Sequence, residues 1–212
     1  MRQFLRRDEA AAQPLSGGAQ SDDQRSATRY TLLIRAAKLI SPAGEFLCVI
    51  RDASESGVNI RTFHPLPDCE AMVIELQNGD RHELDLVWQE ADRAGLKFAR
   101  EADIRRIIES PSRFTKRPLR INLDIPAMLE SGPQQAEVRI LDISQQGAKI
   151  ACDERFAIEQ RVRLSAPEFR ETNAKIRWRR ESQLGLIFED TYQFGDFARI
   201  IADLQLENCT RR

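Results

Sequence analysis

Short runs in which apolar and polar residues alternate cover most of the chain from residue 31 to residue 189. Turn-forming residues separate the runs, and Asn78-Gly79 between two of them is a strong signal for a β-hairpin. Alternation with a period of two predicts β-strands that each bury one face. The expected strands are 31–40, 45–52, 57–63, 71–76, 81–88 and 95–99, followed by 120–129, 135–142, 147–152, 160–166, 172–178 and 184–189.

Two stretches have helical spacing instead, and each follows a group of six expected strands. Residues 100–110 place Ile104, Ile107 and Ile108 on one face, and residues 191–207 bring apolar residues together in the same way. We expect each stretch to be a helix that lies as a lid on the strands before it.

The chain repeats itself with an offset of 90 residues. "RDASESGVNI" at 51–60 corresponds to "LDISQQGAKI" at 141–150, and "WQEADRAGLKF" at 88–98 corresponds to "WRRESQLGLIF" at 178–188. A turn that merely needed polar residues would not recur with matching flanks. The repeat predicts a mainly β protein with two tandem six-stranded antiparallel β-barrels, each followed by a C-terminal α-helix.

The repeat also suggests domain boundaries. We expect a disordered N-terminal tail at 1–22, because this segment is rich in Ala, Gln, Ser and Gly, then a first domain at 23–110 and a second at 111–212. Trp88 and Trp178 end alternating apolar faces, so we expect them to fill the barrel cores. A role in stacking on a ligand is the less favoured alternative.

Two pairs of arginines precede the two groups of strands. Arg25 and Arg29 are four residues apart, as are Arg113 and Arg117, but these pairs are offset by 88 residues. The second copy therefore has two extra residues before its aspartate. We expect them in the first hairpin of the second copy, since loops absorb insertions more readily than strands.

Composition narrows the function. The 212 residues include 32 basic and 33 acidic side chains, so the excess of positive charge typical of nucleic-acid-binding proteins is absent. No apolar run reaches the length of a membrane span, and the N-terminus lacks the apolar core of a secretory signal. We therefore expect a cytoplasmic protein that binds no nucleic acid.

Cysteine and histidine give no sign of a metal or catalytic site. The four cysteines are far apart without a C-x-x-C pair, which predicts neither a zinc site nor a disulfide framework. His64, in an expected loop, and His82, at the start of an expected strand, have no evident orienting partner. We expect no metal, no cofactor and no enzymatic activity.

The arginine pairs and the D-x-S-x-x-G turns suggest a ligand. Guanidinium groups bind phosphate oxygens and stack on flat rings. A carboxylate accepts hydrogen bonds from the N1–H and N2–H₂ edge of guanine, a serine hydroxyl adds a contact, and glycine permits a positive φ or a close backbone approach. Together these groups are consistent with a guanine nucleotide site, although solvated surface residues would give the same pattern.

The ordered motifs, R-x-x-x-R, D-x-S-x-x-G, a tryptophan, G-x-x-F and a helix, resemble those of the PilZ family of bacterial cyclic di-GMP receptors. The resemblance covers about residues 24–109 and 113–206. It implies that arginines grip the phosphates and guanine faces of cyclic di-GMP and that Asp and Ser hold a guanine edge. The implied ligand-binding residues are Arg25, Arg29, Asp52, Ser54 and Gly57 in the first copy, and Arg113, Arg117, Asp142, Ser144 and Gly147 in the second.

The leading interpretation is a non-enzymatic cyclic di-GMP receptor in which the ligand orders the arginine arm and reorients the domains. The alternative is an adaptor with one or both nucleotide sites vestigial, which binds a protein in motility, biofilm or polysaccharide regulation. A nucleotide-hydrolysing enzyme is disfavoured, because the sequence has neither paired carboxylates nor a metal-ligand cluster.

Overall fold

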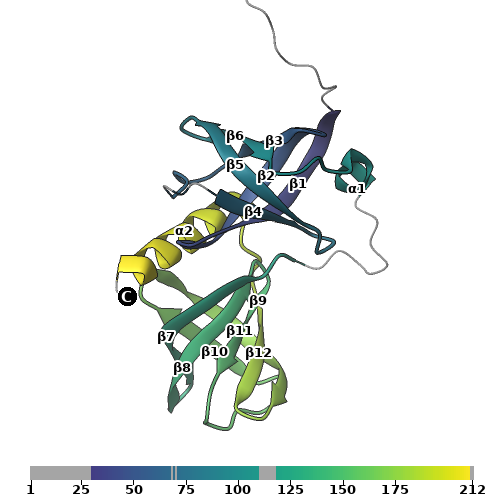
Figure 1. The fold of residues 1–212 in the computed structure, drawn as a ribbon. Coiled ribbons are helices and arrows are strands. Elements are labelled where there is room, and N and C mark those ends of the chain that lie inside the picture. Colours follow the sequence, from purple (N-terminus) through teal and green to yellow (C-terminus); the bar gives the residue numbers. More distant parts are fainter. Residues whose placement is uncertain (1–29, 68, 70, 110–117, 211–212) are drawn as a thin grey trace, which may run out of the picture.

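The computed structural model describes residues 30–67, 69, 71–109 and 118–210, which form two closed β-barrels (Figure 1). The first barrel comprises β1 (Tyr30–Ser41), β2 (Gly44–Ser54), β3 (Gly57–Arg61), β4 (Ala71–Leu76), β5 (Arg81–Gln89) and β6 (Arg93–Phe98), and α1 (Ile104–Glu109) follows it. The second comprises β7 (Ile121–Ser131), β8 (Gln134–Ser144), β9 (Gly147–Ala151), β10 (Arg161–Ala166), β11 (Phe169–Arg180) and β12 (Gln183–Phe188), and α2 (Phe194–Thr210) follows it. The predicted fold class is confirmed. The tail expected at 1–22 lies outside the described residues.

The two barrels have the same topology. Hydrogen-bonded neighbours follow the order β1-β2-β3-β6-β5-β4 in the first barrel and the equivalent order β7-β8-β9-β12-β11-β10 in the second. Neighbouring strands in both barrels are antiparallel. The repeat in the sequence is therefore a repeat of the whole barrel.

Alternation places equivalent apolar residues in the two cores. Residues on the inner faces are almost completely buried, and positions 90 residues apart match: Ile50, Ile60 and Ile74 in the first barrel, and Ile140, Ile150 and Leu164 in the second. Large-to-small substitutions at such buried positions typically cost about 2–5 kcal/mol. The predicted hairpin is also present, because Gly79 has a φ of 90° and the Asp80 backbone N–H donates to Asn78 Oδ1 at 3.0 Å.

The expected place of the two extra residues is wrong. Ser41 pairs with Gly44 and Ser131 with Gln134, so both first hairpins have turns of the same length. The length differences lie upstream: a bulge in β1 is longer than its equivalent in β7, and additional residues precede β7. A bulge can absorb an extra residue within a strand, so insertions are not confined to loops.

The helix α2 contacts both barrels (Figure 1). Phe197 and Ile201 join the core of the second barrel, whereas Ala202 joins the core of the first. Leu47 of β2 reaches across and packs in the second core. The expectation that each helix covers its own barrel is therefore incomplete, since α2 also holds the two barrels together.

A polar network completes the junction between the barrels. Asn122 donates through its backbone N–H and its side-chain Nδ2 to the two carboxylate oxygens of Glu45, both at 2.8 Å. The buried Lys38 ammonium lies 3.3 Å from Glu45, and Gln205 Nε2 donates to the Asn122 carbonyl at 3.0 Å. Because β1, β2, β7 and α2 all contribute, these bonds fix the barrels relative to each other.

Within the described ranges, no helix is long and apolar enough to span a lipid bilayer.

Candidate functional site

The serines of the two D-x-S-x-x-G motifs stabilise tight turns. Ser54 ends β2 and pairs with Gly57 at the start of β3, and its hydroxyl lies 3.4 Å from the Gly57 carbonyl. Ser144 and Gly147 repeat this arrangement between β8 and β9, with the hydroxyl at 3.2 Å. Both serines are buried, so their first role is to hold the turn.

The glycines are needed because the adjacent strand is very close. A Cβ atom on Gly57 would lie 2.5 Å from the Leu96 carbonyl oxygen, and one on Gly147 would lie 2.1 Å from that of Leu186. Neither glycine has a positive φ. Of the two roles considered for glycine, close backbone approach is the one that the structure supports.

Bulges turn the motif aspartates out of the barrels. Ile50 and Asp52 of β2 are two residues apart, but their partners on β3, Ile60 and Asn59, are adjacent, so β2 has one extra residue here. Since a shift of one residue moves a side chain to the other face of a strand, Ile50 points into the core and Asp52 points outward. The bulge from Ile140 to Asp142 has the same effect in the second barrel.

Equivalent bulges turn the tryptophans outward, so their predicted core position is wrong. β5 has one extra residue between Leu86 and Trp88 relative to its partner strand β6. The same bulge occurs directly before Trp178 on β11. Trp88 is 39% exposed and Trp178 is 40% exposed. The alternation that placed both indoles inside is broken one residue before each of them.

A row of paired residues joins each aspartate to a tryptophan. Asp52 pairs with Asn59, Asn59 with Gly95, and Gly95 with Trp88. The equivalent row of the second barrel is Asp142, Lys149, Gly185 and Trp178. Paired residues on antiparallel strands project from the same face of the sheet, so each carboxylate and indole share an outer surface.

The glycine in each row makes room for the indole. A Cβ atom on Gly95 would lie 2.1 Å from Trp88 Nε1, and one on Gly185 would lie 2.0 Å from Trp178 Nε1. Each indole therefore rests on the backbone of the neighbouring strand and leaves part of its surface open to solvent. Such exposed aromatic surface can stack on a flat base.

The two carboxylates have different surroundings. Asp142 is only 7% exposed. Its Oδ1 accepts a hydrogen bond from Arg120 Nη1, and its Oδ2 forms an ion pair with Lys149 Nζ at 3.0 Å. The residue opposite Asp52 is the neutral Asn59, whose buried Oδ1 has no hydrogen-bond partner in the described part of the chain. The second carboxylate is thus already bound by two cations.

Sequence reasoning missed Arg120 and Lys149. Arg120 directly precedes the pair Ile121–Ile143, just as Arg29 precedes the equivalent pair Tyr30–Ala53. By strand register, Arg120 therefore corresponds to Arg29, whereas the 88-residue offset had selected Arg117. Lys149 could have been found from its place two residues after Gly147, on the strand that pairs with the aspartate.

The four arginines predicted to bind the ligand, Arg25, Arg29, Arg113 and Arg117, lie outside the described residues. Their position relative to the aspartates stays a prediction.

His64, Cys48 and Cys152 are buried, and His82 and Cys69 are partly buried. His64 is 9% exposed, and burial lowers the pKa values of both His64 and His82. Burial raises the pKa values of the Cys48 and Cys152 thiols, which therefore remain protonated at neutral pH. Among the described residues, no group of three His, Cys, Asp or Glu side chains is placed to hold a metal ion.

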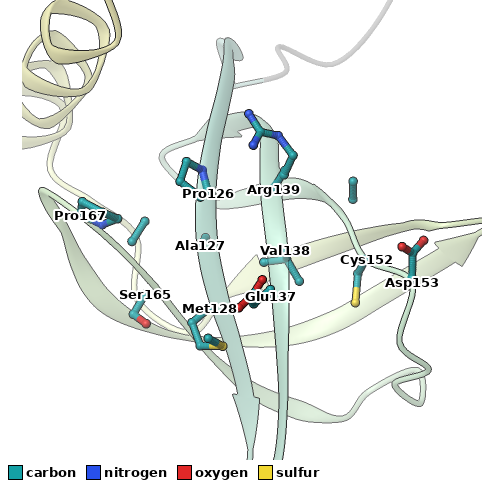
Figure 2. Close-up of a pocket in the computed structure, with 12 residues that line it drawn as sticks. Pro126, Ala127, Met128, Glu137, Val138, Arg139, Cys152, Asp153, Ser165 and Pro167 are labelled. Atoms are coloured by element: carbon teal, nitrogen blue, oxygen red, sulfur yellow. The ribbon is translucent and has the colours of Figure 1, made fainter. Parts of the chain in front are cut away.

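A large cavity lies apart from these rows. Its volume is about 870 Å³, and residues of β7, β8 and β10 and the end of β9 line it, among them Met128, Arg139, Cys152 and Asp153 (Figure 2). Neither Asp142 nor Trp178 is a lining residue. Burial raises the pKa of the Cys152 thiol, so this cysteine is not an activated nucleophile.

Comparisons with solved structures find similar chains from several bacteria. The Borreliella burgdorferi PlzA protein in complex with c-di-GMP is 14% identical, with 81% of this chain and 87% of that chain covered and a TM-score of 0.34. Escherichia coli YcgR in complex with c-di-GMP is 14% identical, with coverage of 84% and 86% and a TM-score of 0.35. The Bacillus subtilis inhibitor of motility MotI/DgrA is 17% identical, with coverage of 85% and 97% and a TM-score of 0.34.

A sequence comparison with curated proteins finds no match. A comparison with protein families matches the PilZ domain twice, at residues 23–110 and at residues 111–203. These two matches cover most of the chain. The chain therefore belongs to the PilZ family.

Proposed function

We propose that the protein is a non-enzymatic receptor for cyclic di-GMP with one nucleotide site on the outer face of each barrel. The observation that carries the proposal is the row that occurs in both barrels, in which bulges turn a motif aspartate and a tryptophan onto the same surface. In this proposal Asp52 and Asp142 accept hydrogen bonds from the guanine N1–H and N2–H₂ edge. The tryptophans stack on a base, and Ser54, Gly57 and their counterparts keep the turn in shape.

The phosphates would be bound by the arginine segments that precede the barrels. Arg25 and Arg29 would serve the first site, and Arg113 and Arg117 the second, because guanidinium groups form paired hydrogen bonds with phosphate oxygens. We infer that ligand binding orders these segments and thereby changes the angle between the domains. The Arg120 carbonyl accepts a hydrogen bond from Lys38 of the first barrel at 3.3 Å, so the segment before β7 is already connected to the junction.

Calorimetric titration with cyclic di-GMP tests the proposal. We expect Asp52→Ala and Asp142→Ala each to remove one class of site, and the double variant to bind no nucleotide. Asp190→Ala is the matched control, since Asp190 is exposed and lies outside both rows. Unchanged binding by the double variant would refute the proposal.

The second candidate function is a PilZ adaptor that binds a protein in motility, biofilm or polysaccharide regulation. The observation that favours it is the pairing of Asp142 with Arg120 and Lys149, because a nucleotide must compete with these cations. A stoichiometry of one nucleotide per chain, located at Asp52 by the variants, would indicate a second barrel that keeps the fold for another purpose.

We further propose that the chain is divided into a tail at 1–22 and domains at 23–110 and 111–212, and that it works in the cytoplasm. We expect no nucleic acid binding and no cleavage of the nucleotide. A filter-binding assay with DNA and RNA, and chromatography of the nucleotide after incubation with the protein, check these two expectations.

A further inference from the structure

A smaller pocket lies where the start of α2 meets the outer face of the first barrel. Its volume is about 380 Å³. Three arginines from adjacent strands line it, Arg35 on β1, Arg51 on β2 and Arg61 on β3, together with Phe63, Phe194 and Gly195. None of the described residues that line the pocket is acidic, and Asp52 and Trp88 are not among them.

The strand register explains why the arginines gather there. Arg51 is the extra residue of the bulge between Ile50 and Asp52, and it is exposed. Arg61 pairs with Val49 on the outer face of the same sheet, and both residues line the pocket. The bulge that turns Asp52 outward therefore also brings a guanidinium to the edge of this pocket.

Aromatic side chains hold one side of the pocket in place. The Arg61 guanidinium carbon lies 5.3 Å from the centre of the Phe63 ring, and Phe63 packs edge-on against Phe194 with 5.6 Å between centroids. A Cβ atom on Gly195 would lie 3.1 Å from Phe63. The pocket thus has an aromatic base that connects the first barrel to α2.

Arg61 shares its carboxylate partner with another arginine. The Asp92 carboxylate lies 3.7 Å from Arg61 Nε and 3.8 Å from Arg93 Nε. Guanidinium groups held close together favour an anion that accepts hydrogen bonds from more than one of them. The first backbone N–H groups of a helix, where Gly195 lies, also lack partners within the helix and favour negative charge.

We propose that this pocket binds a phosphate group, separately from the carboxylate row of the first barrel. The ligand would bridge Arg51 and Arg61 and lie against the first turn of α2. The equivalent position of Arg61 in the second barrel is Ala151, and that of Phe63 is Asp153, so the site belongs to the first barrel alone. The inference does not depend on nucleotide binding at Asp52.

Nuclear magnetic resonance of the full chain tests the site directly. We expect inorganic phosphate, but not chloride at equal ionic strength, to shift the Gly195 amide resonance in a saturable way. Arg51→Gln and Arg61→Gln should each raise the dissociation constant about tenfold, as expected for the loss of one charge-assisted hydrogen bond. Arg177→Gln, an exposed arginine of the second barrel, is the matched control and should leave the dissociation constant unchanged.

Two results would overturn the proposal: a Gly195 resonance that phosphate does not shift, or an unchanged dissociation constant in the Arg51→Gln, Arg61→Gln double variant. A second titration at saturating cyclic di-GMP identifies the source of the phosphate. Loss of the phosphate effect assigns the pocket to a phosphodiester of the nucleotide, and its retention assigns the pocket to a free phosphate or phosphomonoester. If the nucleotide does not bind at all, the first titration still decides the inference.

Discussion

Lys149 and Asp142 face each other across β9 and β8, with the ammonium nitrogen 3.0 Å from a carboxylate oxygen. At the same place in the first barrel, Asn59 faces Asp52. The two barrels therefore share the geometry of the row but differ in its charge. In the first barrel, a ligand that binds the carboxylate meets an acceptor next to a neutral amide. In the second barrel, the same acceptor is already ion-paired.

The two aspartates should differ in their contribution to stability. Asp142→Ala removes the partner of both Lys149 and Arg120, and we expect it to lower the free energy of unfolding by about 1–2 kcal/mol. Asp52→Ala should lower it by less than about 0.5 kcal/mol, as at an ordinary surface position. Urea denaturation followed by circular dichroism measures both values. Equal losses in the two variants would show that the cations contribute nothing.

The two tryptophans should report the two sites separately, because the chain contains only Trp88 and Trp178. The Trp178→Phe variant emits from Trp88 alone, and Trp88→Phe emits from Trp178 alone. Stacking of a guanine base on the exposed indole should quench the emission, and we expect this at a lower cyclic di-GMP concentration for Trp88. Stronger quenching of Trp178 at low nucleotide concentration would reverse the order of the sites.

The strands were predictable because each has a long alternating pattern, but the directions of single residues near bulges were not. Ala174, Ile176 and Trp178 alternate with polar residues without interruption in the sequence, and only the pairing of Trp178 with Gly185 shows that the face has changed. Pairing depends on both strands, so the pattern of one strand cannot locate a bulge. The same limit explains why the tryptophans were assigned to the cores.

Contacts between the barrels were also beyond the sequence pattern. The apolar spacing of α2 predicts a buried face but does not say which barrel covers it. Ala202 packs in the first core while Phe197 packs in the second, because the helix lies between two curved surfaces. The match of Asp52 with Asp142 was predictable from the repeat, whereas the ion pairs of Asp142 with Arg120 and Lys149 were not.

Glu45 should be important for the junction between the barrels. Glu45→Ala removes the acceptor of two hydrogen bonds from Asn122 and a carboxylate partner of the buried Lys38. We expect a loss of about 2–3 kcal/mol in the free energy of unfolding, because a buried charge loses a partner. Amide hydrogen exchange should also become faster at the start of β7.

Two controls make this measurement specific. Glu45→Gln keeps an acceptor for Asn122 and should lose less stability than Glu45→Ala. Glu83→Ala changes an exposed glutamate of the same barrel and should leave the exchange at β7 unchanged. Unaltered exchange in Glu45→Ala would contradict a role of Glu45 at the junction.

Acid should destabilise the protein in part through His64. The ring lies 5.0 Å from the Phe46 ring, centroid to centroid, and its Nε2 is buried without a hydrogen-bond partner in the described part of the chain. Burial lowers the pKa of His64 from its ordinary value of 6.5, although the hydrogen bond with the Pro65 carbonyl and the charge of Asp203 on α2 partly oppose the shift. The unfolded chain therefore takes up a proton at a higher pH than the folded chain does. The stabilising contribution is complete above about pH 6.5 and is lost as the pH falls through the pKa of the folded state.

His64→Phe should lose less stability than the natural chain between pH 7.5 and pH 5.5 in urea denaturation. His82→Phe serves as the comparison, since burial also lowers the pKa of His82. The His82 ring packs against Phe98, with 5.4 Å between the ring centroids, and not at α2. If His64→Phe and the natural chain lose the same stability over this pH range, His64 is not one of the groups responsible.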